Sequence, residues 1–433
     1  MNLILKRLQT EWPSWMVVAF IALLPFGRAP ELPLSILALA LPFLLRNPEH
    51  RARARRVAVY LIPLFLCFWL PMVLSSFDSF NPDKSSLRSL AALRYLAAAI
   101  TIGILLAPPS ARWRVLRWSA YLLAFWAMDG FIQLYLGADL FGITMHQDRL
   151  NALFLRQYQF YGPTLAMLSP LLLEYARRRW PAWAWVLSFA VVLGAVTIAG
   201  MRAGWLVMGV VLVVYGLLLI RNRENRDLRF ASVTVPLLAV ITILAGYWAS
   251  PMLQQRLEQT LTALDGSEAS VNFASTYRLP IFKTAFSMYQ AHPINGVGVR
   301  GFEAAYLVYA EPDDFHIQQS GGVRGALHAH NVVLEVMADT GTIGLLGLAG
   351  GLLLFWRYWR LMPPAQRQEA FPYALAVGLV FFPVNSHFAV FGTYLSSLVW
   401  VLIGLWAATW PNEAQGPLGD PNRRTEAHRE DGS

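Results

Sequence analysis

The sequence predicts an all-α polytopic membrane protein with about twelve transmembrane helices and one long external helical loop. Of its 433 residues, 56% are hydrophobic and only 14% are charged, whereas soluble domains carry about 25% charged residues. Apolar segments of roughly 20 residues, the length that spans a bilayer as a helix, recur along the chain. The segments between them alternate between strongly basic and weakly charged, as cytoplasmic and external loops do. These observations exclude an ordinary soluble domain.

Twelve apolar segments are expected to cross the membrane, nine before a long loop and three after it. We therefore divide the chain into transmembrane helices 1–9 in residues 1–249, an external loop with amphipathic helices in 250–329, transmembrane helices 10–12 in 330–410, and a tail in 411–433. The tail is polar and rich in Pro and Gly, which predicts disorder. The expected spans are residues 12–26, 31–45, 57–76, 88–107, 114–136, 158–176, 180–199, 203–220, 230–249, 330–356, 371–386 and 391–410.

The net charge of +9 follows from membrane topology. Most of the 35 Lys and Arg residues lie in segments that share a side with the N-terminus, such as RNPEHRARARR and RNRENRDLR. Because cytoplasmic loops carry such an excess, we expect both termini in the cytoplasm and the long loop outside it. No basic groove with interleaved aromatic residues remains, so we expect no nucleic-acid partner.

The only cysteine, Cys67, lies inside an expected span. No disulfide framework is therefore possible, and the external loop has to be held together by packing. The first span begins like a signal sequence, but no small-residue cleavage site follows it, so we expect an uncleaved anchor.

The loop of residues 250–329 is too long to be a plain connector. Its segment PMLQQRLEQTLTAL places Leu253, Leu257, Leu261 and Leu264 on one helical face. A second segment, YRLPIFKTAFSMYQA, has an apolar face made of Tyr277, Ile281, Phe282, Ala285, Met288 and Tyr289. We expect both to form amphipathic helices of a small cap, with residues 137–157 lining the same cavity.

The segment HAHNVVLEVMADTGTIGLL, residues 328–346, places His330 and Asn331 at the start of the helix after this loop. The electropositive end of a helix disfavours imidazolium, which predicts a neutral His330 able to accept a proton. Exposed amides at such an end also favour an anion such as phosphate. We interpret His328 as a supporting residue.

Asn331, Glu335 and Asp339 form a polar stripe along this apolar helix. Acidic residues within spans are costly and usually face a cavity, which favours a function. The alternative is a capping and packing site in which the acids pair with arginines such as Arg94.

Two external arginines are further candidates. Arg202 stands at the outer tip of the turn AGMRAG between two apolar segments, and Arg278 opens the second amphipathic helix. The planar guanidinium group can bind a phosphate through two parallel charge-assisted bonds. The alternative for Arg202 is that its side chain snorkels to lipid headgroups.

The stretch HPINGVGVRGF matches G-x-G-x-x-G, but no strand precedes it, so we reject a dinucleotide site. Its glycines predict a turn that brings backbone amides, with Arg300, near the membrane face. A metal site is not expected either. His328 and His330 point to different faces of a helix, and no third ligand stands at a recognisable spacing.

These residues together resemble the O-antigen ligase and polymerase superfamily. The resemblance covers residues 190–350 and rests on TIAGMRAGW, STYRLPIFKTAF, HPINGVGVRGF and the block H-x-H-N-x-x-L-E, in this order. It implies a GT-C-like glycosyltransferase in the bacterial inner membrane, with its active site facing the periplasm. Arg300 is a departure, since relatives often carry smaller residues there; it can contact the donor diphosphate or lipid headgroups.

The resemblance also implies a chemistry. The donor is a glycan on undecaprenyl diphosphate and the acceptor is a sugar hydroxyl of the lipid A core. Arg202 and Arg278 stabilise the charge on the departing diphosphate, and His330 is the base for the acceptor hydroxyl. His328, Asn331, Glu335 and Arg300 are supporting candidates. Transfer is expected to invert the anomeric configuration, with no metal and no cofactor.

Three alternatives remain open. An O-antigen polymerase and a protein O-oligosaccharyltransferase belong to the same superfamily, although one dominant loop favours the ligase. A transporter or flippase of a lipid-linked glycan is the alternative from another class, for which Arg94 and Asp129 within spans are the supporting features. A structural scaffold does not need His330, Arg202 and Arg278 together.

Overall fold

The computed structural model describes residues 2–146, 149–154, 158–221, 226–249, 251–383 and 388–410. Throughout this part of the chain the secondary structure is helical, and the only β-type pairings are two isolated bridges, Ala138–Thr144 and His146–Arg149. The expected disordered tail, residues 411–433, lies outside the described residues.

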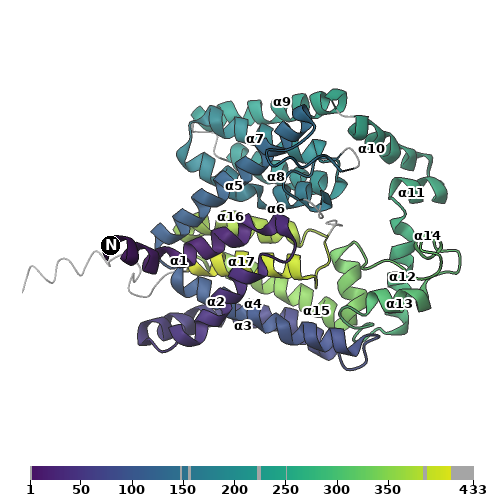
Figure 1. Ribbon diagram of the computed structural model, residues 1–433, viewed down its shortest axis with the longest axis horizontal. Helices are drawn as coiled ribbons and strands as arrows, with labels where there is room; N and C mark the ends of the chain where they lie inside the picture. The colour runs from purple at the N-terminus through teal and green to yellow at the C-terminus, as the bar shows by residue number, and fades with distance from the viewer. Residues whose placement is uncertain are drawn as a thin grey trace, which may run out of the picture.

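Helices α1 to α9 and α15 to α17 form a bundle, and α10 to α14 form an arc at one end of it, on the right in Figure 1. The first nine are α1 (Asn2–Ala22), α2 (Glu31–Leu44), α3 (Pro48–Leu74), α4 (Pro82–Leu105), α5 (Pro109–Leu136), α6 (Tyr161–Arg179), α7 (Ala182–Ile198), α8 (Arg202–Arg221) and α9 (Arg226–Ala249). The arc, which we call the cap, contains α10 (Pro251–Leu261), α11 (Glu268–Ala274), α12 (Arg278–Ala291), α13 (Phe302–Tyr309) and α14 (Phe315–Gln319). The chain returns to the bundle through α15 (Val332–Leu361), α16 (Pro364–Val380) and α17 (Thr393–Ala408).

Every expected span overlaps one of the twelve bundle helices. By length and composition, four of them are suited to cross a membrane, namely α3, α4, α8 and α15. The bent pair Thr234–Trp248 and Leu253–Asp265, whose axes meet at 101°, is a fifth candidate. The helices α2, α7 and α17 are apolar but shorter. The helical, multi-pass character of the chain is thus supported, while the count of twelve spans and the GT-C-like architecture stay predictions.

Small residues allow close helix contacts in the bundle. A Cβ atom on Gly404 of α17 would lie 3.0 Å from Cα of Ala99 in α4. In the same way, Gly347 of α15 faces the carbonyl of Cys67 and Pro71 in α3. Van der Waals contact between closely approaching helices is a main source of stability where lipid removes the hydrophobic drive between them.

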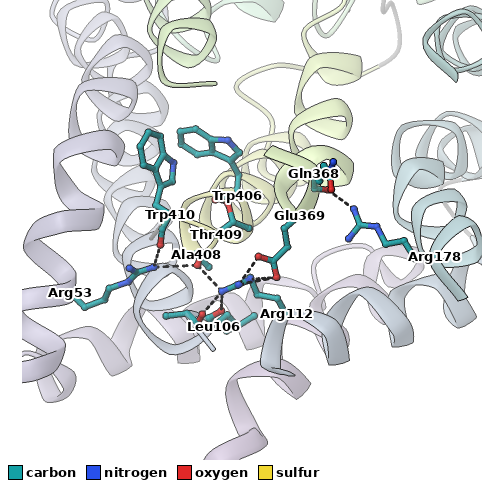
Figure 2. Close-up of polar contacts among 11 residues, drawn as sticks. Arg53, Leu106, Arg112, Arg178, Gln368, Glu369, Trp406, Ala408, Thr409 and Trp410 are labelled. Atoms are coloured by element: carbon teal, nitrogen blue, oxygen red, sulfur yellow. Dashed lines mark hydrogen bonds and ion pairs between the residues drawn. The ribbon is translucent and has the colours of Figure 1, made fainter. Parts of the chain in front are cut away.

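Arginines secure the end of the bundle that lies far from the cap (Figure 2). Arg53 donates to the carbonyls of Ala408 at 3.2 Å and Trp410 at 3.0 Å, where α17 ends. Arg112 donates to the carbonyl of Ala408 at 2.9 Å and binds both carboxylate oxygens of Glu369 at 2.9 and 2.8 Å. The terminal carbonyls of a helix lack intrahelical donors, so these two arginines satisfy the end of α17.

Helix α15 is broken at Gly341, whose φ is 62° and ψ is −155°. The turn of residues 293–298 fills this break by exchanging hydrogen bonds with it. Val297 and Gly298 donate their amides to the carbonyls of Ala338 and Asp339 at 2.8 and 3.0 Å. In the other direction, the amides of Thr342 and Ile343 donate to the carbonyls of Pro293 and Ile294 at 2.8 and 3.1 Å. The glycine-rich turn therefore supplies hydrogen-bond partners for the backbone groups that the break in α15 leaves unpaired.

The cap packs on the bundle through α12. Ile281, Ala285 and Met288 are buried in a small core that includes Ala338 of α15. The expected shared face of the first amphipathic segment is only partly buried: Leu253 is buried, whereas Leu261 and Leu264 are 60% and 84% exposed. Thr262–Asp265 leave the α-helix as a 3-10 turn, which takes Leu264 off the shared face.

The two charged residues that favoured a transporter have structural partners. Arg94 forms an ion pair with Glu31 at 2.6 Å, so the suggestion that Arg94 pairs with the acids of α15 is wrong. Asp129 is fully buried and accepts a hydrogen bond from the amide of Leu140 at 3.0 Å. Both residues join neighbouring elements of the bundle.

Candidate functional site

A cavity of about 310 Å³ lies where the cap meets the bundle. Its size is at the lower end of the range for small-molecule pockets, roughly 300 to 1,000 Å³. It brings together Arg202, Arg278 and His330, which are far apart in the sequence. We call it the arginine pocket; its lining residues are Arg149, Gln159, Gly200, Met201, Arg202, Ala203, Arg256, Thr276, Arg278, Ile281, His316 and His330.

Arg202 is the first residue of α8, as its position in the AGMRAG turn predicts. Gly200 has a φ of 70°, which reverses the chain after α7. Nη1 of Arg202 donates to the carbonyl of Ala274 and lies 3.5 Å from Oγ1 of Thr276. Nε and Nη2 of Arg202 are buried and have no hydrogen-bond partner. Two donors of this guanidinium group are thus buried without a protein acceptor among the described residues.

Arg278 is the first residue of α12, as expected. The two residues before it, Thr276 and Tyr277, have φ values of 60° and 56°, in the left-handed region. This conformation is fixed from the cap, because the ring of Tyr277 stacks on Phe315 at 3.8 Å and its carbonyl lies 2.8 Å from Nε2 of His316. Burial lowers the pKa of the Arg278 guanidinium below its usual value. Its charge is therefore held in a partly desolvated place.

His330 lies just before α15 rather than in its first turn, so the prediction that it opens the helix is wrong. Asn331 is the N-cap residue, and its side chain accepts from the amides of Val333 and Leu334 at 3.0 and 3.1 Å. These amides are consequently not open to an anion, contrary to expectation. His330 has a φ of 51°, and left-handed residues other than glycine concentrate at functional sites. The turn directs it into the arginine pocket instead.

His328 supports His330 directly. The two rings lie 3.9 Å apart between centroids, and the amide of His330 donates to Nδ1 of His328 at 3.2 Å. Oε2 of Glu335, which is 2% exposed, is 3.6 Å from the same Nδ1. That distance is too long for a hydrogen bond, and the amide of His330 already occupies the nitrogen. The carboxylate of Glu335 therefore lies beside the ring of His328 without a hydrogen bond to it.

The remaining acid of the stripe, Asp339, faces the glycine-rich turn. It is 3% exposed, and the backbone amide of Arg300 lies beside its carboxylate. Neither Glu335 nor Asp339 lines the arginine pocket, so the stripe as a whole does not face it. Arg300 has an exposed side chain and a φ of 69°, and it also lies outside the pocket.

Three basic residues of the pocket were not singled out from the sequence: Arg149, Arg256 and His316. Arg149 belongs to the segment 137–157, which we expected near the cavity, and Arg256 belongs to the first amphipathic helix. An available signal was that arginines are unusual in external segments.

The pocket is strongly cationic. Four arginines line it, and none of its lining residues among those described is acidic. Arg202 is repelled by Arg256, Arg278 and Arg149, in decreasing order. Like charges that share a partly desolvated cavity repel one another, and an anion reduces that repulsion. The arrangement therefore favours an anionic ligand.

No metal-binding cluster occurs within the described ranges, where no three His, Cys, Asp or Glu residues come together suitably for an ion. Catalysis without a metal or a cofactor stays a prediction.

The fold and the pocket define a multi-pass helical membrane protein with a cationic cavity beneath a helical cap. Residues 187–349 match the model of the O-antigen ligase family, which confirms the resemblance over this segment. The matched segment contains Arg202, Arg278 and His330, but it begins after Arg149. None of the curated proteins matches the chain.

Proposed function

We propose that this protein is an O-antigen ligase, which transfers a glycan from undecaprenyl diphosphate to a sugar hydroxyl of the lipid A core. The observation that carries the proposal is that Arg202, Arg278 and His330 line one cavity. The family match supports a transfer between a lipid-linked glycan and a lipid acceptor.

The proposed reaction is a displacement at the anomeric carbon of the donor glycan. The acceptor oxygen attacks that carbon while its bond to the diphosphate oxygen breaks, and the diphosphate leaves with the electron pair. Arg202 and Arg278 stabilise the charge that develops on the departing oxygens. The hydroxyl proton passes to His330 as general base. Attack opposite the leaving group inverts the anomeric configuration.

His328 and Glu335 position the base in this proposal. His328 holds the backbone amide of His330 at 3.2 Å, and buried Glu335 lies beside His328. Asn331 fixes where α15 begins and so fixes the turn that carries His330. Arg300 has no role in the transfer, because it lies outside the pocket.

The proposal places the protein in the bacterial inner membrane, with both termini in the cytoplasm and the arginine pocket at the periplasmic face. Both substrates are amphiphiles, so a site at the boundary of membrane and water is where their reacting groups can meet.

The test is glycan transfer by the purified full-length protein in detergent, with chelator present. Undecaprenyl-diphosphate-linked glycan and lipid A-core are supplied, and the product is followed as a gel shift. We expect transfer by the wild type and by Arg300→Gln, and at least a 100-fold loss in His330→Ala with an unchanged melting temperature. Wild-type rates in a folded His330→Ala variant would overturn the assignment of the base.

Two other activities are outcomes of the same assay. Elongation of the lipid-linked donor without acceptor would identify a polymerase, and transfer to a protein hydroxyl would identify an O-oligosaccharyltransferase. A transporter of lipid-linked glycan would give no product at all. The ion pair of Arg94 with Glu31 accounts for one of the two charged residues that favoured transport.

A further inference from the structure

A second cavity lies within the cap. It has a volume of about 250 Å³ and is lined by residues of α11, α12 and α13 and of the segment 311–315. We call it the cap pocket. Pockets for drug-sized ligands measure roughly 300 to 1,000 Å³, so the cap pocket suits a smaller group, such as a single sugar unit. The proposed transfer steps use none of its residues.

The cap pocket and the arginine pocket share a wall. Thr276 and Arg278 line the arginine pocket, whereas Tyr277 between them lines the cap pocket. In the same way, His316 lines the arginine pocket and the preceding residue, Phe315, lines the cap pocket. The rings of Tyr277 and Phe315 stack at 3.8 Å, and Nε2 of His316 lies 2.8 Å from the carbonyl of Tyr277. A substrate in the arginine pocket therefore lies next to a second cavity.

The two cavities differ in charge. Four carboxylates line the cap pocket, those of Glu268, Glu311, Asp313 and Asp314, and Lys283 is the only basic residue in its described lining. This lysine forms an ion pair with Glu268 at 2.5 Å. Because like charges repel one another, a phosphate group is favoured in the arginine pocket and disfavoured in the cap pocket. The cap pocket therefore suits an uncharged or positively charged group.

The hydrogen-bond acceptors of the cap pocket are of two kinds. The buried carboxylate of Asp314 accepts from the amides of His316 and Ile317 at 2.8 and 3.2 Å and from the hydroxyl of Tyr306 at 3.0 Å. It therefore stabilises the fold. In contrast, Oδ1 of Asn272 is buried and has no hydrogen-bond partner among the described residues. A buried acceptor without a partner costs stability, and a hydroxyl group of a ligand can supply the missing donor.

A sugar unit matches the remaining surfaces of the cap pocket. Sugars carry several hydroxyl donors together with an apolar face of C–H groups. The exposed carboxylates of Glu311 and Asp313 can accept from such hydroxyls, and the stacked rings of Tyr277 and Phe315 provide apolar surface. A metal ion is the alternative ligand for carboxylates, but within the described ranges no three potential ligands come together suitably for an ion.

We propose that the cap pocket binds one uncharged or amino-bearing sugar unit of a glycan substrate. Asn272 and Asp313 bind its hydroxyl groups, and Tyr277 and Phe315 contact its apolar face. The inference rests on the proposed function, because it needs a glycan whose reacting end lies in the arginine pocket. Two substrates contain such a unit, the lipid-linked donor and the lipid A-core acceptor, and the experiment distinguishes them.

The test measures binding of two free oligosaccharides to the full-length protein in detergent by calorimetry. One is the glycan released from the lipid-linked donor by mild acid, and the other is the core oligosaccharide freed of its lipid. We expect one of them to bind the wild type. Its affinity should fall about fivefold in Asn272→Ala, which loses a hydrogen bond, and about fivefold in Asp313→Asn, which replaces a charged acceptor by a neutral one.

Glu258→Gln is the matched control, because it changes an exposed carboxylate of the cap that lies outside the cap pocket. It should bind as the wild type does. Thermal unfolding separates binding from folding. Without oligosaccharide, Asn272→Ala should melt at the wild-type temperature or above it, because the change removes a buried unpaired acceptor and introduces a better helix former. A residue that only stabilises the cap would not lose binding while keeping stability.

The transfer assay gives a second measurement. Asn272→Ala and Asp313→Asn should raise the KM for the substrate whose oligosaccharide binds and leave kcat unchanged. The reason is that a contact remote from the reacting bond is made equally in the ground state and in the transition state. The KM for the other substrate should stay at the wild-type value.

The inference is overturned if neither oligosaccharide binds the wild type, or if folded Asn272→Ala and Asp313→Asn bind as tightly as Glu258→Gln. Transfer by the wild type would then leave the proposed function standing. If instead binding depends on Asn272 and Asp313 but no transfer occurs, the sugar site stands and the proposed ligase activity fails.

Discussion

Arginines at the two ends of this bundle have opposite surroundings. Arg112, at the end far from the cap, is bound by both carboxylate oxygens of Glu369 and by the carbonyls of Leu106, Ala107 and Ala408 (Figure 2). Arg202, beneath the cap, contacts Ala274 and Thr276 through one nitrogen and leaves Nε and Nη2 buried without a hydrogen-bond partner. All three guanidinium nitrogens of Arg112 donate hydrogen bonds to the protein. Among the described residues, only Nη1 of Arg202 does so.

The number of hydrogen-bonded guanidinium nitrogens therefore distinguishes arginines that stabilise the fold from arginines proposed to bind a ligand. A desolvated arginine with unused donors costs stability, because its buried N–H groups lose their hydrogen bonds to water. Composition and charge cannot make this distinction, because both arginines lie at the ends of apolar helices. The predictions below test it, from the largest expected effect to the smallest.

The largest effect is expected for Arg202→Gln. Removing a preorganised group that stabilises developing charge costs about 100- to 1,000-fold in rate, so glycan transfer should fall by that factor. The melting temperature should not fall, because only part of the guanidinium group is used by the fold. Arg300→Gln should transfer at the wild-type rate in the same assay. A loss of stability in Arg202→Gln that accounts for the lost transfer would contradict the comparison.

Arg112→Gln should lower the stability of the protein and leave glycan transfer per folded molecule unchanged. Breaking a buried ion pair by removing one partner costs about 3–5 kcal/mol, and we expect the lower end, roughly 3 kcal/mol, because Glu369 is 33% exposed. The free energy of unfolding is measured by denaturant titration in detergent.

A double variant sharpens this result. In Arg112→Met with Glu369→Leu, apolar side chains replace both charges, so about half of the lost stability should return. If the double variant is as unstable as Arg112→Gln, the contacts of Arg112 with the carbonyls, rather than the ion pair, hold this end of the bundle.

Gly341→Ala should destabilise by about 2 kcal/mol, because its φ is 62° and a Cβ atom would meet the carbonyl of Ile294. Gly378→Ala in α16 is the matched control, since nothing lies within 4 Å of its Cβ position. The control should be neutral or slightly stabilising, as alanine is a better helix former than glycine. Equal melting temperatures for both variants would show that the break in α15 is not needed.

The smallest effect is expected for Asn331→Ala. Loss of an N-cap side chain costs about 1 kcal/mol, and transfer should fall less than in Arg202→Gln, since His330 keeps its own contacts. Asn331→Asp retains the accepting oxygen and should keep most of the stability. Unfolding in detergent measures both. Identical behaviour of Asn331→Ala and the wild type would show that α15 can start without this cap.

The sequence predicted the helical segments well, because their apolar length and alternating basic loops are local properties. It also predicted the chain reversal before Arg202 and the starts of α8 and α12. It was wrong about the start of α15, where Asn331 caps the helix and puts His330 one residue outside it. The pattern H-x-H-N fits both alternatives, and only the left-handed φ of His330 decides between them.

The partners of charged residues were harder to predict. Asp339 lies on the helical face of Glu335, yet it contacts the turn before α13, because the break at Gly341 draws that turn into the helix. Arg149 and Arg256 were missed because their signal, an arginine in a segment expected to be external, is shared with arginines that only contact lipid headgroups.

The sequence by itself determined the class of this protein, its helical segments and three residues of its candidate site. These follow from hydropathy, charge distribution and motifs, all of which act over a few turns of helix. The tertiary structure decided which arginines are bound by the fold and which line the cavity. The reason is physical: whether a guanidinium group finds a carbonyl, a carboxylate or only other arginines depends on segments far apart in the chain, as Arg202 and Arg112 demonstrate.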